Sequence, residues 1–129
     1  MGFDQYHEPP EEMSAETRTK ARMFASLQEE ADAIGWYDQR MSLEPDPEAR
    51  AIMEDAQGEE FKHFSMDLEY LLRREPRWRQ IARGVLFREG DIVEHGEAAE
   101  AGETVEGDDD TSSAGESSLG IGSLKGAGI

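Results

Sequence analysis

Two long stretches of helical periodicity, separated by one proline-marked turn, constrain the fold of this chain more than any other feature. Apolar residues recur at steps of three and four over residues 23–41 and again over 49–71, which is the spacing of one face of an α-helix. The segment 43–47, Leu-Glu-Pro-Asp-Pro, predicts a turn in which Asp46 caps the second helix and Pro47 takes its first position. The sequence therefore predicts an antiparallel helical hairpin.

Capping residues and prolines set the expected boundaries of the helices. Ser14 predicts the N-cap of the first helix, which we expect over residues 15–41, preceded by an extended arm that two adjacent prolines punctuate. The second helix is expected over residues 47–74. Pro76 interrupts it and predicts a third, shorter helix that ends near Phe87.

Two helices of this length and a short third one cannot enclose a core by themselves. At 1.5 Å per residue, each long helix would extend about 40 Å. The apolar faces that remain must be covered by another copy of the chain. We therefore expect an all-α fold in which the hairpin, with its short third helix, dimerises into a four-helix bundle.

The charge and the absence of cysteine exclude several classes of function. Thirty acidic residues against thirteen basic ones give a net charge of −17 over 129 residues, which repels nucleic acid and anionic membranes and attracts cations. Without cysteine, disulfides, zinc ribbons and thiolate-bound clusters are excluded. No apolar run is long enough for a bilayer, and the N-terminus lacks the features of a signal peptide. We expect no nucleic-acid partner, no membrane partner and a cytoplasmic location.

The composition changes after residue 88. From Glu89 onward there are eleven acidic residues, one lysine and nine of the thirteen glycines. Such a segment cannot bury enough apolar surface to offset the entropy of ordering, so we expect it to be disordered. The chain then divides into a helical domain over 1–88, a disordered acidic linker over 89–116, and a terminal segment over 117–129.

Glu30, Glu60 and His63 form the pattern that predicts chemistry. Glu30 lies inside the apolar stripe of the first helix, and Glu60 and His63 lie on one face of the second. Residues three apart on a helix place their Cβ atoms about 5–6 Å apart, which suits a carboxylate and an imidazole that bind one ion. Oxygen and nitrogen ligands without thiolate favour iron or manganese among redox metals.

Glu30 and the Glu-x-x-His pair together make half of a two-metal site. Di-iron bundles take one Glu from each of two helices and a Glu-x-x-His from each of the other two. A two-fold dimer would complete the set, with Glu60 bridging and positions open for oxygen or peroxide. The chemistry this predicts is oxidation of Fe(II) to Fe(III), which Trp36, Tyr37 and Asp67 could tune from beside the ligands.

Simpler interpretations stay open on the residues alone. A Glu-x-x-His pair occurs by chance on many helices, Glu30 could pair with an arginine across the hairpin, and His63 could be an ordinary half-buried histidine. Aromatic residues at such positions are more often core residues, and acidic ones more often a solvated face; these are Trp36, Tyr37, Glu29 and Asp32. The function could then be an enzyme, a metal-dependent assembly module, or a structural adaptor whose carboxylates pair with arginines.

Three segments of the chain resemble the encapsulated ferritins. They are Glu-Glu-Ala-Asp-Ala-Ile-Gly-Trp-Tyr-Asp-Gln-Arg at 29–40, Glu-Glu-Phe-Lys-His at 59–63 and Leu-Glu-Tyr-Leu-Leu-Arg-Arg at 68–74, and the resemblance extends over residues 7–88. It implies a ferritin-like four-helix bundle made from two-helix protomers, with a di-iron ferroxidase centre at the dimer interface. It also implies an annular decamer, a pentamer of dimers, with no storage cavity of its own.

The resemblance also implies roles for particular residues. The iron ligands of the family fall on Glu30, Glu60 and His63. The carboxylates at which metal enters fall on Glu29 and Asp32; the family pattern has Glu where this chain has Asp32, and the shorter side chain weakens that assignment. The aromatic residues beside the centre fall on two positions, Trp36 and Tyr37.

The end of the chain resembles the cargo-loading peptides that encapsulin shells bind. Residues 118–126 read Ser-Leu-Gly-Ile-Gly-Ser-Leu-Lys-Gly, with Leu119, Ile121 and Leu124 spaced between glycines. These apolar side chains could dock in a groove inside the shell, while the acidic linker gives reach. The resemblance implies iron storage as mineral inside an encapsulin nanocompartment in the cytoplasm, or else a structural cargo protein without turnover.

Overall fold

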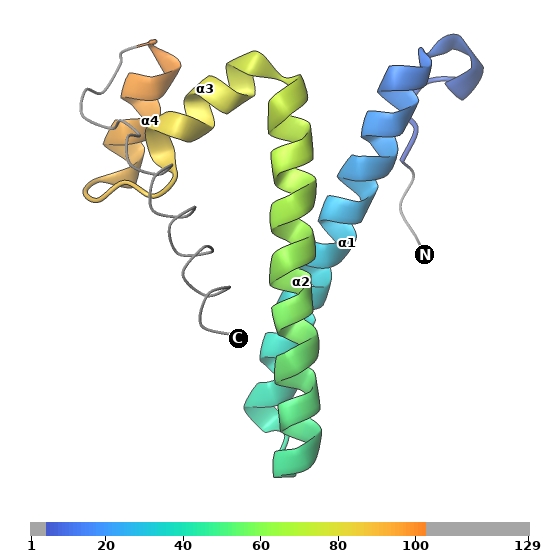
Figure 1. Cartoon of the computed structure of the whole chain (residues 1–129), viewed down its shortest axis with the longest axis vertical. Coiled ribbons are helices and arrows are strands. Elements are labelled where there is room, and N and C mark those ends of the chain that lie inside the picture. The colour runs from blue at the N-terminus through green and yellow to red at the C-terminus, as the bar shows by residue number, and fades with distance from the viewer. Residues whose placement is uncertain (1–4, 103–129) are drawn as a thin grey trace, which may run out of the picture. The chain divides into compact units, whose positions relative to one another are not determined.

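The computed structural model describes residues 5–102, and every regular element among them is helical (Figure 1). The elements in chain order are η1 Pro10–Glu12, α1 Ala15–Leu43, α2 Pro47–Arg74, α3 Pro76–Val85 and α4 Ile92–Glu100. No strand occurs in this range, and none of its helices is both long and apolar enough to cross a bilayer. The chain divides into two compact units, Met1–Arg79 and Gln80–Ile129, which are described separately.

The two long helices are confirmed, with the caps that the sequence predicts. The Ser14 hydroxyl accepts a hydrogen bond from the Thr17 amide at 3.1 Å, and the Asp46 carboxylate accepts one from the Ala49 amide at 2.8 Å. Pro47 occupies the first turn of α2, where its missing N–H costs nothing. Each helix therefore begins where a side chain replaces the absent backbone partner.

The N-terminal arm differs from the extended segment expected. Pro10–Glu12 form a single 3-10 turn, and the Arg18 guanidinium donates hydrogen bonds to the carbonyl oxygens of Pro10 at 2.8 Å and Met13 at 2.6 Å. The turn at residues 10–13 is thereby fixed to the start of α1. The two prolines predict a break before α1, whereas the bonds from Arg18 to the carbonyls of the turn were not predicted.

A buried glutamine joins α1 and α2, which run antiparallel and diverge toward the N-terminal end of α1 (Figure 1). Gln57 is 7% exposed. Its Nε2 donates to the Ile34 carbonyl at 3.1 Å and to Asp38 Oδ1 at 2.7 Å. A buried amide must find such partners, so these bonds set the register between the two helices.

Large side chains connect the helices where they diverge. Lys20 Nζ lies 3.1 Å from Glu75 Oε1, at the end of α2. The rings of Phe24 and Trp78 stack with their centroids 6.1 Å apart. These contacts hold α1 to the α2–α3 junction.

The first unit buries few apolar side chains. Leu71 and Leu72 are 0% and 6% exposed, and α1 contains no buried residue. On the outside, Ile52 is 67% and Met66 61% exposed. The expectation that a lone hairpin leaves its apolar faces uncovered is confirmed.

The second unit corrects two expectations about the segment after α3. Helix α3 ends at Val85, not near Phe87, because the backbone turns at Phe87 (φ 62°) and Gly90 (φ 105°). Helix α4 then lies within the range 89–116 that was expected to be disordered. The rest of that linker, from residue 103, lies outside the described residues.

Local signals explain α4. The Asp91 carboxylate caps it by accepting from the Glu94 amide at 3.0 Å, and the ring Nε2 of His95 lies 2.8 Å from the Glu89 carbonyl. Ala99 is 5% exposed and packs so closely on Gly84 that a Cβ there would lie 2.5 Å from the Ala99 Cβ. Composition averaged over the whole tail hides this capped, small-residue helix.

Candidate metal centre

Glu30 from α1 and Glu60 and His63 from α2 meet between the two long helices. One ligand atom of each residue can be chosen so that all three lie within 4.8 Å of one another. His63 Nδ1 is 3.8 Å from Glu60 Oε2, as three-residue spacing on a helix requires. The structure thus brings together the three residues that the sequence singled out.

The register of the hairpin explains why Glu30 faces Glu60. The Gln57 amide bonds to the Ile34 carbonyl. One turn along from this bond, Glu30 precedes Ile34 by four residues and Glu60 follows Gln57 by three. Because the helices are antiparallel, going back along α1 from Ile34 to Glu30 and forward along α2 from Gln57 to Glu60 leads in the same direction. The two carboxylates therefore lie at the same height along the hairpin. Gln57 therefore positions the cluster without belonging to it.

Every charged group that shifts the pKa of Glu30 is acidic. Burial is the largest cause that raises its pKa from 4.5 to about 7, followed by contact with the Asp67 carboxyl and repulsion from Asp67, Glu60 and Glu29. The two carboxyls can share a hydrogen bond only while one of them holds a proton. When both are ionised, Glu30 Oε2 and Asp67 Oδ2 are buried without a donor among the described residues.

No lysine or arginine in the described part of the chain forms a salt bridge with Glu30. Among residues 5–102, the salt bridges of arginine and lysine go to Glu59, Glu69 and Glu75. The alternative that Glu30 pairs with an arginine across the hairpin is therefore not what the structure has. A buried carboxylate without a compensating charge is costly, and a metal cation would remove that cost.

The donor set fits a hard or borderline cation such as iron or manganese. It offers two carboxylates and one imidazole, with no sulfur. The side chains of His63 and Glu60 are 43% and 24% exposed, so the cluster is open on one side. That opening leaves room for an incoming ion and for ligands from another chain.

The other predicted residues lie around or away from this cluster. Glu29 and Asp32 are exposed on α1, and Glu29 is close enough to raise the pKa of Glu30. Trp36 is 53% exposed, while Tyr37 is half-buried with the Arg40 guanidinium 5.3 Å from its ring centre. Their roles as metal-entry and neighbouring residues stay predictions. Outside the described range lie the three docking residues Leu119, Ile121 and Leu124.

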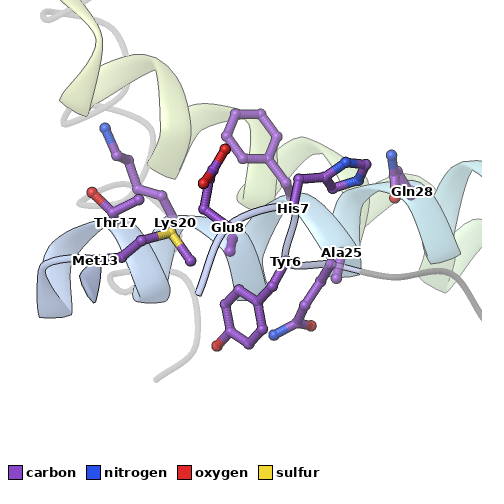
Figure 2. Close-up of a pocket in the computed structure, with 11 residues that line it drawn as sticks. Tyr6, His7, Glu8, Met13, Thr17, Lys20, Ala25 and Gln28 are labelled. Carbon is purple, nitrogen blue, oxygen red and sulfur yellow. The ribbon is translucent and has the colours of Figure 1, made fainter. Parts of the chain in front are cut away.

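A separate pocket lies between the N-terminal arm and α1. Figure 2 shows Tyr6, His7 and Glu8 from the arm facing side chains of α1 that include Lys20. The volume of the pocket is about 630 Å³. None of the three clustered residues lines it, so this pocket and the candidate metal centre are different places.

Sequence reasoning missed the polar link that aligns the helices. The link consists of the buried Gln57, whose amide donates to the Asp38 carboxylate. The sequence pattern does not decide whether either position faces the core or the surface. The available signal was a glutamine at the core-facing spacing, three residues before Glu60. Its partner on the other helix depends on the register, which spacing alone does not give.

Comparison with known proteins decides the family. The profile of the EncFtn-like family matches residues 5–89, more than half of the chain. The chain belongs to the EncFtn-like family. All three clustered residues of this EncFtn-like chain lie within the matched range.

Two curated relatives and one solved structure agree with this assignment. An encapsulated ferritin-like protein from Rhodospirillum rubrum is 43% identical over 122 residues, covering 93% of this chain and 87% of the relative. A ferritin-like protein from Thermotoga maritima is 41% identical over 91 residues, covering 70% and 80%. A crystal structure of a Nitrosomonas europaea protein is 37% identical with a TM-score of 0.67, covering 69% of this EncFtn-like chain and 99% of that one.

Proposed function

We propose that this protein is a ferroxidase that oxidises Fe(II) to Fe(III) at a di-iron centre formed between two protomers. The observation that supports it most directly is the cluster of Glu30, Glu60 and His63, within 4.8 Å and with no basic partner for Glu30 among the described residues. The names of the relatives, ferritin-like and encapsulated ferritin-like, support iron as the metal. Iron is here the substrate as well as the bound metal.

The protein residues would bind the ions and hold them next to each other. In this proposal each chain would supply three ligands: Glu30 and His63 would each bind a single ion, and Glu60 would bridge the two ions. The same three residues of a partner chain would supply the other half of the site. Two Fe(II) ions release two electrons on oxidation, the number that reduces dioxygen to hydrogen peroxide with two protons, or peroxide to water.

Exposed apolar residues on the same side of α2 as His63 support the two-chain centre. Ile52 and Met66, at 67% and 61% exposure, precede and follow His63 by eleven and three residues on α2, so they share its side of the helix. Burying such side chains stabilises an interface by about 25 cal/mol per Å² of apolar area. A second chain docked here would cover them and close the centre. The annular decamer implied by the family resemblance is part of this proposal.

Aerobic addition of Fe(II) tests the enzymatic activity. The wild-type protein should produce ferric absorbance at least ten times faster than Glu30→Ala, Glu60→Ala or His63→Ala. Glu54→Gln serves as a control: Glu54 is exposed on α2, and its substitution removes one charge outside the cluster, so the rate should stay at the wild-type value. If the wild-type rate equals that of the three cluster variants, the enzyme proposal fails.

The second candidate is a metal-dependent assembly module, and the open side of the cluster favours it. An ion held by half a site could join two chains without turnover. Sedimentation with and without metal distinguishes the two functions: dimerisation that needs metal, in a protein that oxidises no iron, supports the assembly module.

We also propose that residues 117–129 load the protein into an encapsulin shell, which the name of the Rhodospirillum rubrum relative supports. The apolar residues Leu119, Ile121 and Leu124 would dock, and oxidised iron would then be stored as mineral in the shell. Co-expression with the shell tests this role. A chain that ends at Ser118 should keep its ferroxidase activity and be absent from purified shells; continued loading would disprove the role.

A further inference from the structure

Asp67 lies on the same side of α2 as Glu60 and His63, four residues after His63. Helical side chains tilt toward the N-terminus of their own helix. Because α1 and α2 are antiparallel, Glu30 tilts toward the C-terminal end of α2 while Asp67 tilts back toward Glu60. This explains how the Asp67 carboxyl comes close enough to the Glu30 carboxyl to raise its pKa, although Asp67 is seven residues from Glu60.

The contact joins two acidic groups without a basic one. Glu30 Oε2 and Asp67 Oδ2 are both buried, and neither accepts a hydrogen bond within residues 5–102. No salt bridge of a lysine or arginine in this range goes to either carboxyl: on α2, for example, Lys62 pairs with Glu59 at 3.0 Å and Arg73 with Glu69 at 2.7 Å. Like charges in contact away from water destabilise a fold unless something of opposite charge lies nearby.

Asp67 is not itself placed to complete the cluster. The group in which all ligand atoms lie within 4.8 Å contains Glu30, Glu60 and His63 but not Asp67. Its carboxylate stands one side chain away, against Glu30. It can therefore act on a bound ion through its charge and through the orientation of Glu30.

We propose that Asp67 is a positioning residue that sets the charge preference of the metal centre, favouring trivalent over divalent ions. This inference rests on the proposed function. Glu30, Glu60 and Asp67 supply three negative charges per chain, which balance one Fe(III); without Asp67, two charges balance one Fe(II). The added attraction grows with the charge on the ion, so the ferric product gains more than the ferrous substrate.

Binding of Mn²⁺ and Tb³⁺ to the metal-free full chain tests this preference without any turnover. Only binding that Glu30→Ala abolishes is counted, which removes ions held by the rest of the acidic surface. In Asp67→Asn, which keeps the size of the side chain and loses its charge, the ratio of Tb³⁺ to Mn²⁺ affinity should fall about tenfold. Glu54→Gln, which also loses one charge, should leave the ratio unchanged.

A second variant separates charge from packing. Asp67→Glu keeps the charge and should retain a Tb³⁺ preference within about threefold of wild type, even if both affinities change. Equal losses for both ions in Asp67→Asn, or an unchanged ratio, would overturn this inference and leave the proposed centre standing. Absence of Glu30-dependent binding in the wild-type chain would overturn the proposed function and this inference together.

Discussion

Glu30 combines two properties that rarely occur together on a helix surface: its carboxyl is partly buried, and all its charged neighbours are acidic. A group in this position favours its neutral form, which is why its pKa rises to about 7. The side chain stays in the fold because the rest of the hairpin fixes it there. The residue that best predicts chemistry is thus also a local source of instability in the metal-free protein.

The pH dependence of stability should report this directly. The folded pKa of Glu30 lies above its unfolded value of 4.5, so between these values the folded state binds more protons than the unfolded state. The free energy of unfolding of the metal-free protein should therefore fall as the pH rises from about 4.5 to 7. Glu30→Gln cannot ionise and should lack this component.

Thermal unfolding in a chelator at several pH values checks this prediction. The Tm of wild type relative to Glu30→Gln should decrease between pH 5 and pH 7.5, with protein concentration held constant. A parallel course for the two proteins would contradict the burial and acidic contacts assigned to Glu30. Asp55→Asn, on the exposed surface of α2, controls for general acidity.

At the scale of the helices, polar contacts and small residues determine how elements align. Gln57 buries its amide and bonds to two groups of α1. Gly84 lets α3 and α4 approach until Ala99 is buried. Each contact is made by one side chain, so each can be tested by one substitution.

Gln57→Ala should lower the stability of the hairpin by about 1–3 kcal/mol, because it removes two hydrogen bonds and leaves a gap between the helices. It should also slow any reaction at the cluster, since the register of Glu30 against Glu60 depends on this contact. Urea unfolding measures the first effect. The exposed Gln39, on α1, provides the control Gln39→Ala, for which little change is expected.

Gly84→Ala should loosen α4. The added methyl would lie 2.5 Å from the Ala99 Cβ, a clash whose relief costs about 1–3 kcal/mol. Amide hydrogen exchange in residues 92–100 should become faster, and a second change, Ala99→Gly, should restore protection. Unchanged exchange in α4 of the Gly84→Ala protein would show that the packing of Gly84 on Ala99 is unimportant.

Gly58→Ala is the contrasting case, because a Cβ at Gly58 would lie in open space. This substitution should stabilise α2 by about 0.5–1 kcal/mol.

The sequence predicts local structure here better than it predicts contacts between helices. Ser14, Asp46 and Pro47 mark the helix starts because capping depends on a few neighbouring residues. The pairing of Glu60 with His63 is likewise predictable, because it depends only on their three-residue spacing within one helix. The contacts of Gln57 with α1 depend on register, and α4 depends on a cap and a small-residue contact that are too local for an average over an acidic, glycine-rich tail to detect.

For the whole molecule, the exposed apolar surface of the hairpin predicts association between chains. Ile52→Asp should shift the protein toward monomer in sedimentation and reduce iron oxidation at the same time, because Ile52 is 67% exposed and shares the side of His63. The fold of the chain itself should change little. Ala51→Asp is the control, because it adds the same charge at an exposed neighbouring position and should leave association unchanged. An Ile52→Asp dimer as tight as wild type would argue against this face as the interface.

The open side of His63 has a consequence for when the chemistry can begin. A newly synthesised chain that carries only three ligands holds half of what the reaction needs, so it should leave iron unoxidised until it meets a second copy. At high dilution the rate should rise with the square of the protein concentration. Reactive oxygen by-products would then arise only after assembly, and translation in an iron-rich cell would proceed without them.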